Sequence, residues 1–349
     1  MITNINELTE LQAMLDGGYI TRRKHPTADL FIHNYTAKAQ YDNVWNETTL
    51  TCRGLITDAS GLIVSRPFRK FFNLEQVEQL PNEPFEVFEK MDGSLGISYW
   101  IDDEPCIATR GSFDSEQAKV ANKILSTCNT MILLPDYTYL FEIIYPQNKV
   151  VIDYGQRSEL VLLAVIENDT GNEFSFPDVA RRAWEWAGFP VVKSYSEVTD
   201  INQLKNLTLP NAEGFVIRFA SGFRVKVKLA EYVRLHKLLT GITEKTILED
   251  YLMTGASIEE LLEHVPDEFN EWVRKTIDTF RTQYGDIMSK ALEIMNSTQA
   301  ITRKEYADVF TKTPYAAILF KMLDGKDYSQ LIWKMLIPKR FDTFKRDEA

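Results

Sequence analysis

The alternation of apolar and polar residues divides the chain at about residue 230. Before that point, short runs rich in β-branched and aromatic residues are separated by Gly, Asn, Asp and Ser, a pattern typical of strands joined by turns. We expect strands at residues 30–35, 55–57, 62–65, 137–144, 160–166, 215–219 and 223–228. The turn sequences Asp-Ala-Ser-Gly and Ala-Ser-Gly indicate that 55–65 and 215–228 are hairpins.

Helices accompany these strands and then replace them. In the first part, apolar stripes and cap signals predict helices at residues 6–15, 115–129 and 176–186. After residue 230 the helical spacing is continuous, and we expect helices at 230–239, 244–253, 257–265, 267–296, 302–310, 314–323 and 328–336. The sequence therefore predicts an α+β fold in residues 1–235, followed by an all-α domain in residues 236–349.

A lysine ends one predicted strand beside a tight turn. Lys90-Met91-Asp92-Gly93 lies between strand-like residues 85–88 and 95–100. A lysine held there has limited freedom, and if it is desolvated among other cations its amine becomes a nucleophile. Gly93 allows close approach of a ligand because it has no Cβ, and Asp92 is expected to order the turn. The alternative is a charged hairpin turn, for which Asp-Gly is a common signal.

Two carboxylates and two lysines interrupt strands that are otherwise apolar. Glu142 follows Tyr-Leu-Phe, and Glu213 precedes Gly-Phe-Val-Ile; a buried carboxylate is costly unless it is paired or bound to a ligand or metal. Lys226 and Lys228 alternate with valine and project from one face of a strand, where they repel each other unless an anion is bound. The ordinary alternatives are an edge-strand salt bridge for Glu142 and a solvent-facing strand side for the lysines.

Further cations lie beside aromatic residues upstream. Arg53, Lys70 and Arg110 each follow or precede a predicted strand, and Phe71 and Phe72 follow Lys70. A surface position is the default for any single one of them. Together with the strand lysines and carboxylates, however, they form a set suited to binding a nucleoside triphosphate with its metal and displacing pyrophosphate.

Composition and charge narrow the class of protein. Hydrophobic residues make up 44% of the 349, with 20 Phe, 15 Tyr and 6 Trp, enough for sizeable cores. The three cysteines form no close pair, and no apolar stretch is long enough to span a bilayer, so we expect a soluble cytoplasmic protein without a membrane partner. The net charge of −11 argues against a nucleic-acid coat protein but is compatible with a local basic cleft.

The order and spacing of these segments resemble the motifs of the covalent nucleotidyltransferases, the polynucleotide ligases and mRNA capping enzymes. The segments are Lys90-Met91-Asp92-Gly93, Phe141-Glu142-Ile143, Glu213-Gly214-Phe215-Val216 and Lys226-Val227-Lys228. Within that superfamily, residues 52–54, 65–67, 70–73 and 110–118 are similar to the bacteriophage RNA ligase 1 family, the tRNA-repair ligases of T-even-type phages. The match covers about residues 50–230. Arg110 departs from the pattern, which has a lysine there, and an arginine contacts anions with a different geometry.

The resemblance implies a nucleotidyltransferase core of antiparallel sheets and an ATP-dependent RNA ligase. Lys90 would attack the α-phosphate of ATP to form lysyl-AMP, with Lys226 and Lys228 acting at the same phosphate. AMP would then pass to an RNA 5′-phosphate, and a 3′-hydroxyl would seal the junction. The residues expected around the nucleotide, besides these lysines, are Arg53, Lys70, Phe72, Gly93, Arg110, Glu142, Glu213 and Val216.

More specific roles follow from the same resemblance. Arg53 and Lys70 are candidates for the β- and γ-phosphates, and Phe72 and Val216 for the nucleoside pocket. Glu142 would bind the ribose hydroxyls or a hydrated metal, and Glu213 would hold Mg²⁺ or its water shell; Mn²⁺ is an alternative metal for both. The helical domain would select RNA, with nicked tRNA as the expected partner of a monomeric enzyme. Two alternatives stay open: a catalytically inactive RNA-binding relative, and a DNA ligase or capping-type enzyme, although these usually carry an OB-fold where this sequence turns helical.

Overall fold

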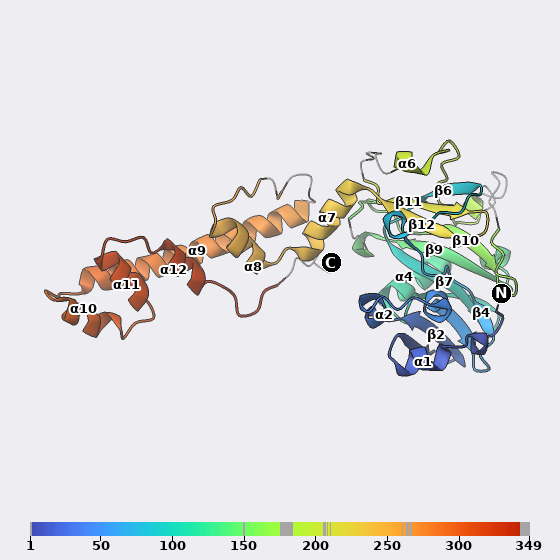
Figure 1. Cartoon of the computed structure of the whole chain (residues 1–349), viewed down its shortest axis with the longest axis horizontal. Helices are drawn as coiled ribbons and strands as arrows, with labels where there is room; N and C mark the ends of the chain where they lie inside the picture. The colour runs from blue at the N-terminus through green and yellow to red at the C-terminus, as the bar shows by residue number, and fades with distance from the viewer. Residues whose placement is uncertain are drawn as a thin grey trace. The chain divides into compact units, whose positions relative to one another are not determined.

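The computed structural model describes residues 2–148, 151–174, 184–204, 207, 209, 211–259, 261, 262, 265 and 267–342. The chain divides into two compact units, Met1–Val233 and Arg234–Ala349. The first unit combines antiparallel sheets with helices, and the second is helical (Figure 1), which confirms the predicted α+β class.

Strands of the first unit form three four-stranded sheets within the described residues. The first sheet has the order β1 (Ile20–Lys24), β2 (Leu30–Tyr35), β3 (Arg53–Asp58) and β4 (Ile63–Ser65). The second has the order β10 (Glu159–Glu167), β9 (Tyr137–Ile144), β7 (Ser94–Ile101) and β8 (Glu104–Thr109). The third has the order β5 (Phe72–Asn73), β12 (Arg224–Lys228), β11 (Gly214–Phe219) and β6 (Phe85–Lys90). All of these pairings are antiparallel except β5 with β12.

The two strands that flank the Lys90 turn belong to different sheets. β6 pairs with β11, with Lys90 opposite Gly214, whereas β7 pairs with β8 and β9, with Ser94 opposite Ile143. The hairpin alternative is therefore wrong, because the chain crosses from the third sheet to the second here. A Cβ on Gly93 would lie 2.7 Å from the carbonyl oxygen of Ile143, so the glycine allows the turn to pass close over β9.

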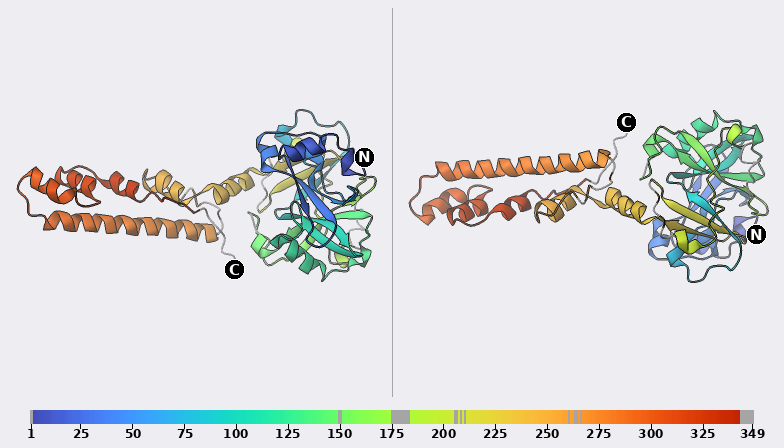
Figure 2. Two further views of the ribbon diagram at one scale, coloured as in Figure 1. Left: turned by 90° about the horizontal axis from the view of Figure 1, so that it is seen from below. Right: turned by 90° about the horizontal axis from the view of Figure 1, so that it is seen from above.

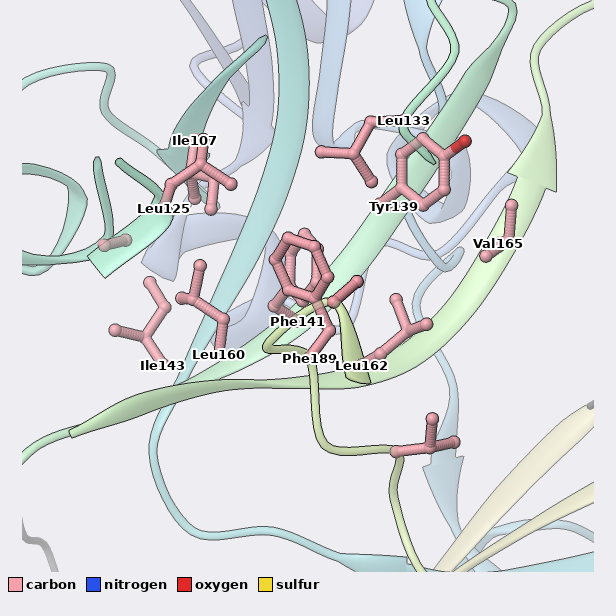
Figure 3. Packing of buried hydrophobic residues seen from close by; sticks show 13 residues of the cluster. Ile107, Leu125, Leu133, Tyr139, Phe141, Ile143, Leu160, Leu162, Val165 and Phe189 are labelled. Atoms are coloured by element: carbon pink, nitrogen blue, oxygen red, sulfur yellow. The ribbon is translucent and has the colours of Figure 1, made fainter. Parts of the chain in front are cut away.

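Side chains of the second sheet alternate between two cores. Phe141 and Ile143 of β9 pack with Leu160, Leu162 and Phe189 on one face (Figure 3), and helix α4 (Glu116–Leu125) covers this cluster through Ala121 and Leu125. Leu140 points to the other face, where a second cluster includes Ile32 and Ile56 of the first sheet. Glu142 has the parity of Leu140, so it projects on the face opposite to Phe141.

Shorter helices complete the first unit. They are α1 (Leu11–Asp16), α2 (Ala37–Tyr41), α3 (Glu47–Thr51), α6 (Ile201–Leu204) and 3-10 helices at Ile5–Glu7, Leu74–Gln76, Thr130–Ile132 and Pro146–Asn148. The single helix predicted over residues 6–15 is wrong: a capping box at Asn4 starts a 3-10 helix, and Leu8 is extended and ends it. Ser115 caps α4 as predicted. The helix predicted at 176–186 lies mostly outside the described residues.

The second unit is built on one long helix. Its elements are α8 (Glu244–Thr246), a π-helix (Ile247–Leu252), α9 (Asp267–Ser297), α10 (Arg303–Phe310), α11 (Ala316–Leu323) and α12 (Ser329–Met335), and α7 (Ala230–Gly241) contains the boundary between the units. Figure 2 shows α9 running alongside α10–α12, and a cluster around Ala291, Phe310 and Ile332 packs them together. Within the described residues, no helix combines the length and apolar composition of a membrane span.

One helix prediction in this unit is wrong. The described part of residues 257–265 forms turns and bends instead of a helix. Pro266 follows this stretch, and its ring disfavours the α-helical conformation at residue 265. The proline accounts for the end of the stretch and not for the turns before it.

Candidate functional site

Strand register brings the predicted lysines onto one face of the third sheet. Gly214 of β11 lies between Lys90 of β6 and Lys228 of β12. Two residues further along β11, Val216 lies opposite Lys226 of β12. Residues opposite each other on neighbouring strands share a face of the sheet. Lys226 and Lys228 are half-buried, so this strand side is partly covered.

Glu213 joins the two lysines at the end of this face. Its side chain is 3% exposed, and its two oxygens lie 2.7 Å from Lys90 Nζ and 3.0 Å from Lys228 Nζ. The backbone fixes this position, because Gly214 has a φ of +152° and a Cβ there would lie 2.0 Å from the carbonyl oxygen of Val227. The predicted nucleophile, which is half-buried, is thus held in an ion pair with the buried carboxylate that is the predicted metal ligand.

Glu142 approaches Lys90 from the second sheet. Its Oε1 accepts a hydrogen bond of 2.9 Å from the backbone N–H of Gly93. Burial raises the pKa of Glu142 to about 7, against the opposing effect of Lys90. β9 is an interior strand between β10 and β7, so the edge-strand alternative for this carboxylate is wrong. The site therefore lies where the second and third sheets meet.

Cations concentrate on the β12 side of Lys90. The pKa of Lys226 is lowered to about 8, by burial first and then by the charges of Lys70, Lys90, Lys228 and Arg53. The pKa of Lys70 is also lowered to about 8, by burial first and then by Arg53 and Arg110. These mutual effects show that the predicted cations, scattered over the sequence, lie within electrostatic reach of one another. Such a cluster attracts a polyanion.

Aromatic rings hold the outer cations of this cluster. Lys70 Nζ lies 4.3 Å from the centroid of Phe72 and 5.1 Å from that of Trp45. Arg110 stacks 5.1 Å from the ring of Tyr35 and donates a hydrogen bond of 3.0 Å to its hydroxyl. Sequence reasoning missed Tyr35 and Trp45, because neither lies in a motif and an isolated aromatic residue is by default part of a core.

Arg53 is placed by the segment that follows Pro67. Its guanidinium lies 5.5 Å from the ring of Phe71 and donates to the carbonyl oxygen of Phe68 at 3.4 Å. Burial lowers the pKa of Arg53 from its ordinary value, and the effect of Tyr35 opposes this. Phe72 and Val216, both predicted for the nucleoside pocket, do not lie opposite the same residue of β12. Phe72 lies opposite Val225, whereas Val216 lies opposite Lys226, the next residue along β12.

Asp92 supports the turn that presents Lys90. Its side chain is 5% exposed, and Oδ2 accepts hydrogen bonds from the backbone N–H groups of Val151 at 2.8 Å and Ile152 at 2.9 Å. Oδ1 accepts a third bond of 2.8 Å from the hydroxyl of Tyr232, at the start of α7. Tyr232 is a further residue that sequence reasoning missed, four positions after Lys228 and on the helix that follows its strand.

The two carboxylates fit a magnesium ion that is bound together with a phosphate. Within the part of the chain that the structure describes, no group of three or more His, Cys, Asp or Glu side chains could hold a metal on its own. Mg²⁺ is usually bound in proteins by one or two carboxylates plus substrate phosphates and water. Glu142 and Glu213, both facing Lys90 beside the cation cluster, match that donor set.

A family model described as RNA ligase matches residues 51–232, more than half of the chain. The chain therefore belongs to this RNA ligase family, the bacteriophage RNA ligases that its motifs resemble. The matched residues include every predicted site residue from Arg53 to Lys228.

Individual relatives are distant. An RNA ligase of Rhodothermus phage RM378 is 22% identical over 400 residues, covering 90% of each chain. A protein of Autographa californica nuclear polyhedrosis virus, named for polynucleotide kinase and RNA ligase, is 23% identical, covering 91% of this chain and 49% of that one, so this chain spans about half the length of that relative. Among solved structures, an archaeal ATP-dependent RNA ligase is 15% identical with a TM-score of 0.46, covering 92% of this chain and 96% of that one.

Proposed function

We propose that this protein is an ATP-dependent RNA ligase that joins a 5′-phosphate to a 3′-hydroxyl through a lysyl-AMP intermediate on Lys90. The contact between Lys90 and the buried Glu213, beside the cluster of Lys226, Lys228 and Lys70, is the observation that carries the proposal. A lysine among cations and next to a buried carboxylate combines a nucleophile, a proton acceptor and a binding site for phosphates.

In the first step, Lys90 Nζ attacks the α-phosphorus of ATP. A P–N bond forms, the bond from the α-phosphorus to the bridging oxygen breaks, and pyrophosphate leaves with the bonding electrons. The proton of the ammonium passes to Glu213, whose oxygen lies 2.7 Å from Nζ, and from there to water. Lys226 and Lys228 stabilise the charge on the α-phosphate, and Arg53, Lys70 and Arg110 hold the β- and γ-phosphates.

Two more displacements use the same face. The 5′-phosphate of an RNA attacks the α-phosphorus and releases Lys90, giving an RNA capped by AMP through a pyrophosphate bond. A 3′-hydroxyl then attacks the RNA phosphate, and AMP leaves. Because each step places negative charge before the same lysines, one cation cluster serves all three.

A divalent metal would be held by Glu142 and Glu213 together with phosphate oxygens. Mg²⁺, or Mn²⁺ in its place, would neutralise charge on the phosphates during each displacement. We propose that Gly93 supports this arrangement indirectly, since its N–H fixes the Oε1 atom of Glu142. Val216, next to Lys226 on the sheet face, would contact the nucleoside.

The helical residues 236–349 would select the RNA. We propose a nicked tRNA as the natural substrate of a monomeric enzyme that acts in the cytoplasm, of the host if the chain is phage-encoded. This part of the proposal rests on the resemblance to tRNA-repair ligases. A comparison of nicked tRNA with unstructured RNA as substrate tests it.

End joining tests the activity as a whole. The protein is incubated with ATP, Mg²⁺ and a short 5′-phosphorylated RNA, and circular or joined products are separated on a denaturing gel. We expect sealing with RNA and ATP, less with 5′-phosphorylated DNA or with GTP, and none with Lys90→Ala. Sealing by Lys90→Ala at the wild-type rate would contradict the mechanism, and preference for DNA or GTP would favour a different nucleotidyltransferase.

A further inference from the structure

A cavity of about 1030 Å³ opens in the first unit beside the cation cluster. Lys70 of the cluster and Phe72 beside it form part of its wall. Much of the remaining wall comes from α3, from the segment 66–72 and from the turn between β11 and β12 with the strand residues beside it, and further residues come from 171–173. Most of the cavity therefore extends beyond the residues assigned to ATP, and the three reaction steps described above leave it without a role.

The wall combines aromatic rings with excess positive charge. Phe68, Phe71 and Phe223 line it, and Phe223 is 39% exposed next to the turn that joins β11 to β12. Among the described lining residues, five cations stand against two carboxylates, which are Glu47 and Glu173. A wall of rings and cations suits a nucleotide, whose base stacks on aromatic side chains while its phosphate meets lysine or arginine.

The carboxylates compensate only some of these cations. Arg224 and Arg218 both form ion pairs with Glu173, and Arg218 also lies 3.0 Å from Glu86, outside the lining. Arg69 lies 2.6 Å from Glu47 in an exposed pair, so the two cations without a carboxylate partner among these pairs are Lys70 and Arg66. Lys70 Nζ instead donates to the carbonyl oxygen of Phe71 at 3.1 Å, and the Arg66 guanidinium donates to the carbonyl oxygens of Ile2 and Asn168. Carbonyl oxygens orient a cation but do not neutralise it, so the cavity keeps a positive field.

The stereochemistry of the reaction indicates which nucleotide this is. In an in-line displacement the incoming and leaving groups lie on opposite sides of the phosphorus. Pyrophosphate therefore leaves the α-phosphorus on the side away from Lys90, where Arg53 and Lys70 are placed. In the second step Lys90 is the leaving group, so the RNA 5′-phosphate enters from that same side. The cavity adjoins Lys70, so it has room for the nucleoside attached to this phosphate.

We propose that this cavity binds the 5′-terminal nucleotide of the RNA, with its base against Phe223 and its backbone near Arg69. The proposal rests on the function proposed above and adds a separate subsite to it. Lys70 then has two successive ligands: the β- and γ-phosphates of ATP, and afterwards the 5′-phosphate of the RNA.

Removal of the ring and of the charge tests the subsite step by step. Phe223→Ala and Arg69→Gln are compared with the wild type in lysyl-AMP formation from ATP and in AMP transfer from isolated lysyl-AMP enzyme to a short 5′-phosphorylated RNA. We expect transfer at low RNA concentration to fall roughly 5- to 100-fold for Phe223→Ala, the range of base–aromatic stacking. Lysyl-AMP formation should stay within about twofold, because neither Phe223 nor Arg69 is among the residues assigned to ATP.

Two controls match these variants. Lys119→Gln removes an exposed cation that pairs with Glu116 at 2.5 Å, as Arg69 pairs with Glu47, and Trp186→Ala removes a ring that is 86% exposed; neither residue lines the cavity. Both should transfer AMP like the wild type. With the wild type, removal of the base from the 5′-terminal nucleotide of the RNA should slow AMP transfer by the same factor as Phe223→Ala does with the intact RNA. With Phe223→Ala, removal of the base should cause no further decrease in AMP transfer.

Unchanged transfer in both variants would overturn the proposal, and so would a parallel fall of lysyl-AMP formation, which would assign the wall to ATP. A wild type that forms no lysyl-AMP refutes the proposed function instead. In that case, binding of a fluorescent 5′-phosphorylated RNA decides the subsite separately: weaker binding by Phe223→Ala than by Trp186→Ala supports it, and equal binding contradicts it.

Discussion

Replacement of Asp92 should damage the stability and the activity of the protein together. The carboxylate is buried and accepts three hydrogen bonds, from the N–H groups of Val151 and Ile152 and from the hydroxyl of Tyr232. Asp92→Ala removes all three and leaves two buried N–H donors without their acceptor. A hydrogen bond to a charged group contributes about 1.5–3 kcal/mol, and the bonds share one acceptor, so we expect a loss of about 3–6 kcal/mol in the free energy of unfolding.

Two milder variants each alter only some of these hydrogen bonds, so each should lose less of the free energy of unfolding. In Asp92→Asn, the amide oxygen can still accept from both backbone N–H groups while the amide nitrogen donates to the Tyr232 oxygen, so the loss should be about 1–3 kcal/mol. Tyr232→Phe removes the hydroxyl and keeps the backbone contacts, at an expected cost of about 1–2 kcal/mol. Urea unfolding followed by tryptophan fluorescence measures all three free energies, and labelling with radioactive ATP measures the effect on Lys90.

The order of the three variants is the test. Lysyl-AMP formation should fall most in Asp92→Ala, because the turn that presents Lys90 loses its anchor. If Asp92→Ala unfolds with a free energy within about 1 kcal/mol of the wild type, the hydrogen bonds do not hold the turn. If Tyr232→Phe costs as much as Asp92→Ala, the support comes from α7 and the backbone contacts of Asp92 are unimportant.

Three further predictions follow from the site. The pKa of Glu142 is raised from 4.5 to about 7, so the protonated carboxyl contributes stability that is fully present below pH 4.5. Up to about 3 kcal/mol of the free energy of unfolding is lost as the pH rises from 4.5 through 7. Glu142→Gln should abolish this loss in urea unfolding, and the same slope of unfolding free energy against pH in the variant would contradict it. Because Lys226 has a pKa of about 8, the KM for ATP should rise between pH 7 and 9, and Lys226→Arg, which stays protonated, should flatten the rise in lysyl-AMP kinetics. Gly93→Ala places a Cβ 2.7 Å from the carbonyl oxygen of Ile143, so we expect about 1–3 kcal/mol of destabilisation and slower labelling of Lys90; wild-type labelling would show that the turn has room.

Local pattern was sufficient for most of the fold. The apolar and aromatic runs predicted β2 and β9 with their observed bounds, and β9 is buried along most of its length because cores cover both of its faces. The helical spacing of apolar residues over 6–15 was misleading, because it continues past Leu8. The capping box formed by Asn4 and Glu7 starts a separate 3-10 helix, and this helix ends at Leu8. Capping residues give information that the apolar spacing does not.

The candidate site was predictable in its residues and not in its contacts. Charged residues inside apolar strands identified Glu142, Lys226 and Lys228, since burial of a charge requires a compensating partner. The pairing of Lys90 with Glu213 depends on the register of β6 against β11, which joins segments more than a hundred residues apart. Tyr35, Trp45 and Tyr232 carry no charge, so nothing in the sequence separates them from ordinary core aromatics.

The most direct test of the account is covalent labelling of Lys90. The protein is incubated with ATP radioactive at the α-phosphate and with Mg²⁺, separated on a denaturing gel, and its labelled peptide is identified by mass spectrometry, with Lys90→Ala and Lys119→Gln alongside. We expect label on the wild type and on Lys119→Gln, attached to Lys90, and none on Lys90→Ala. Label on another residue, or no label with any nucleoside triphosphate, would contradict it.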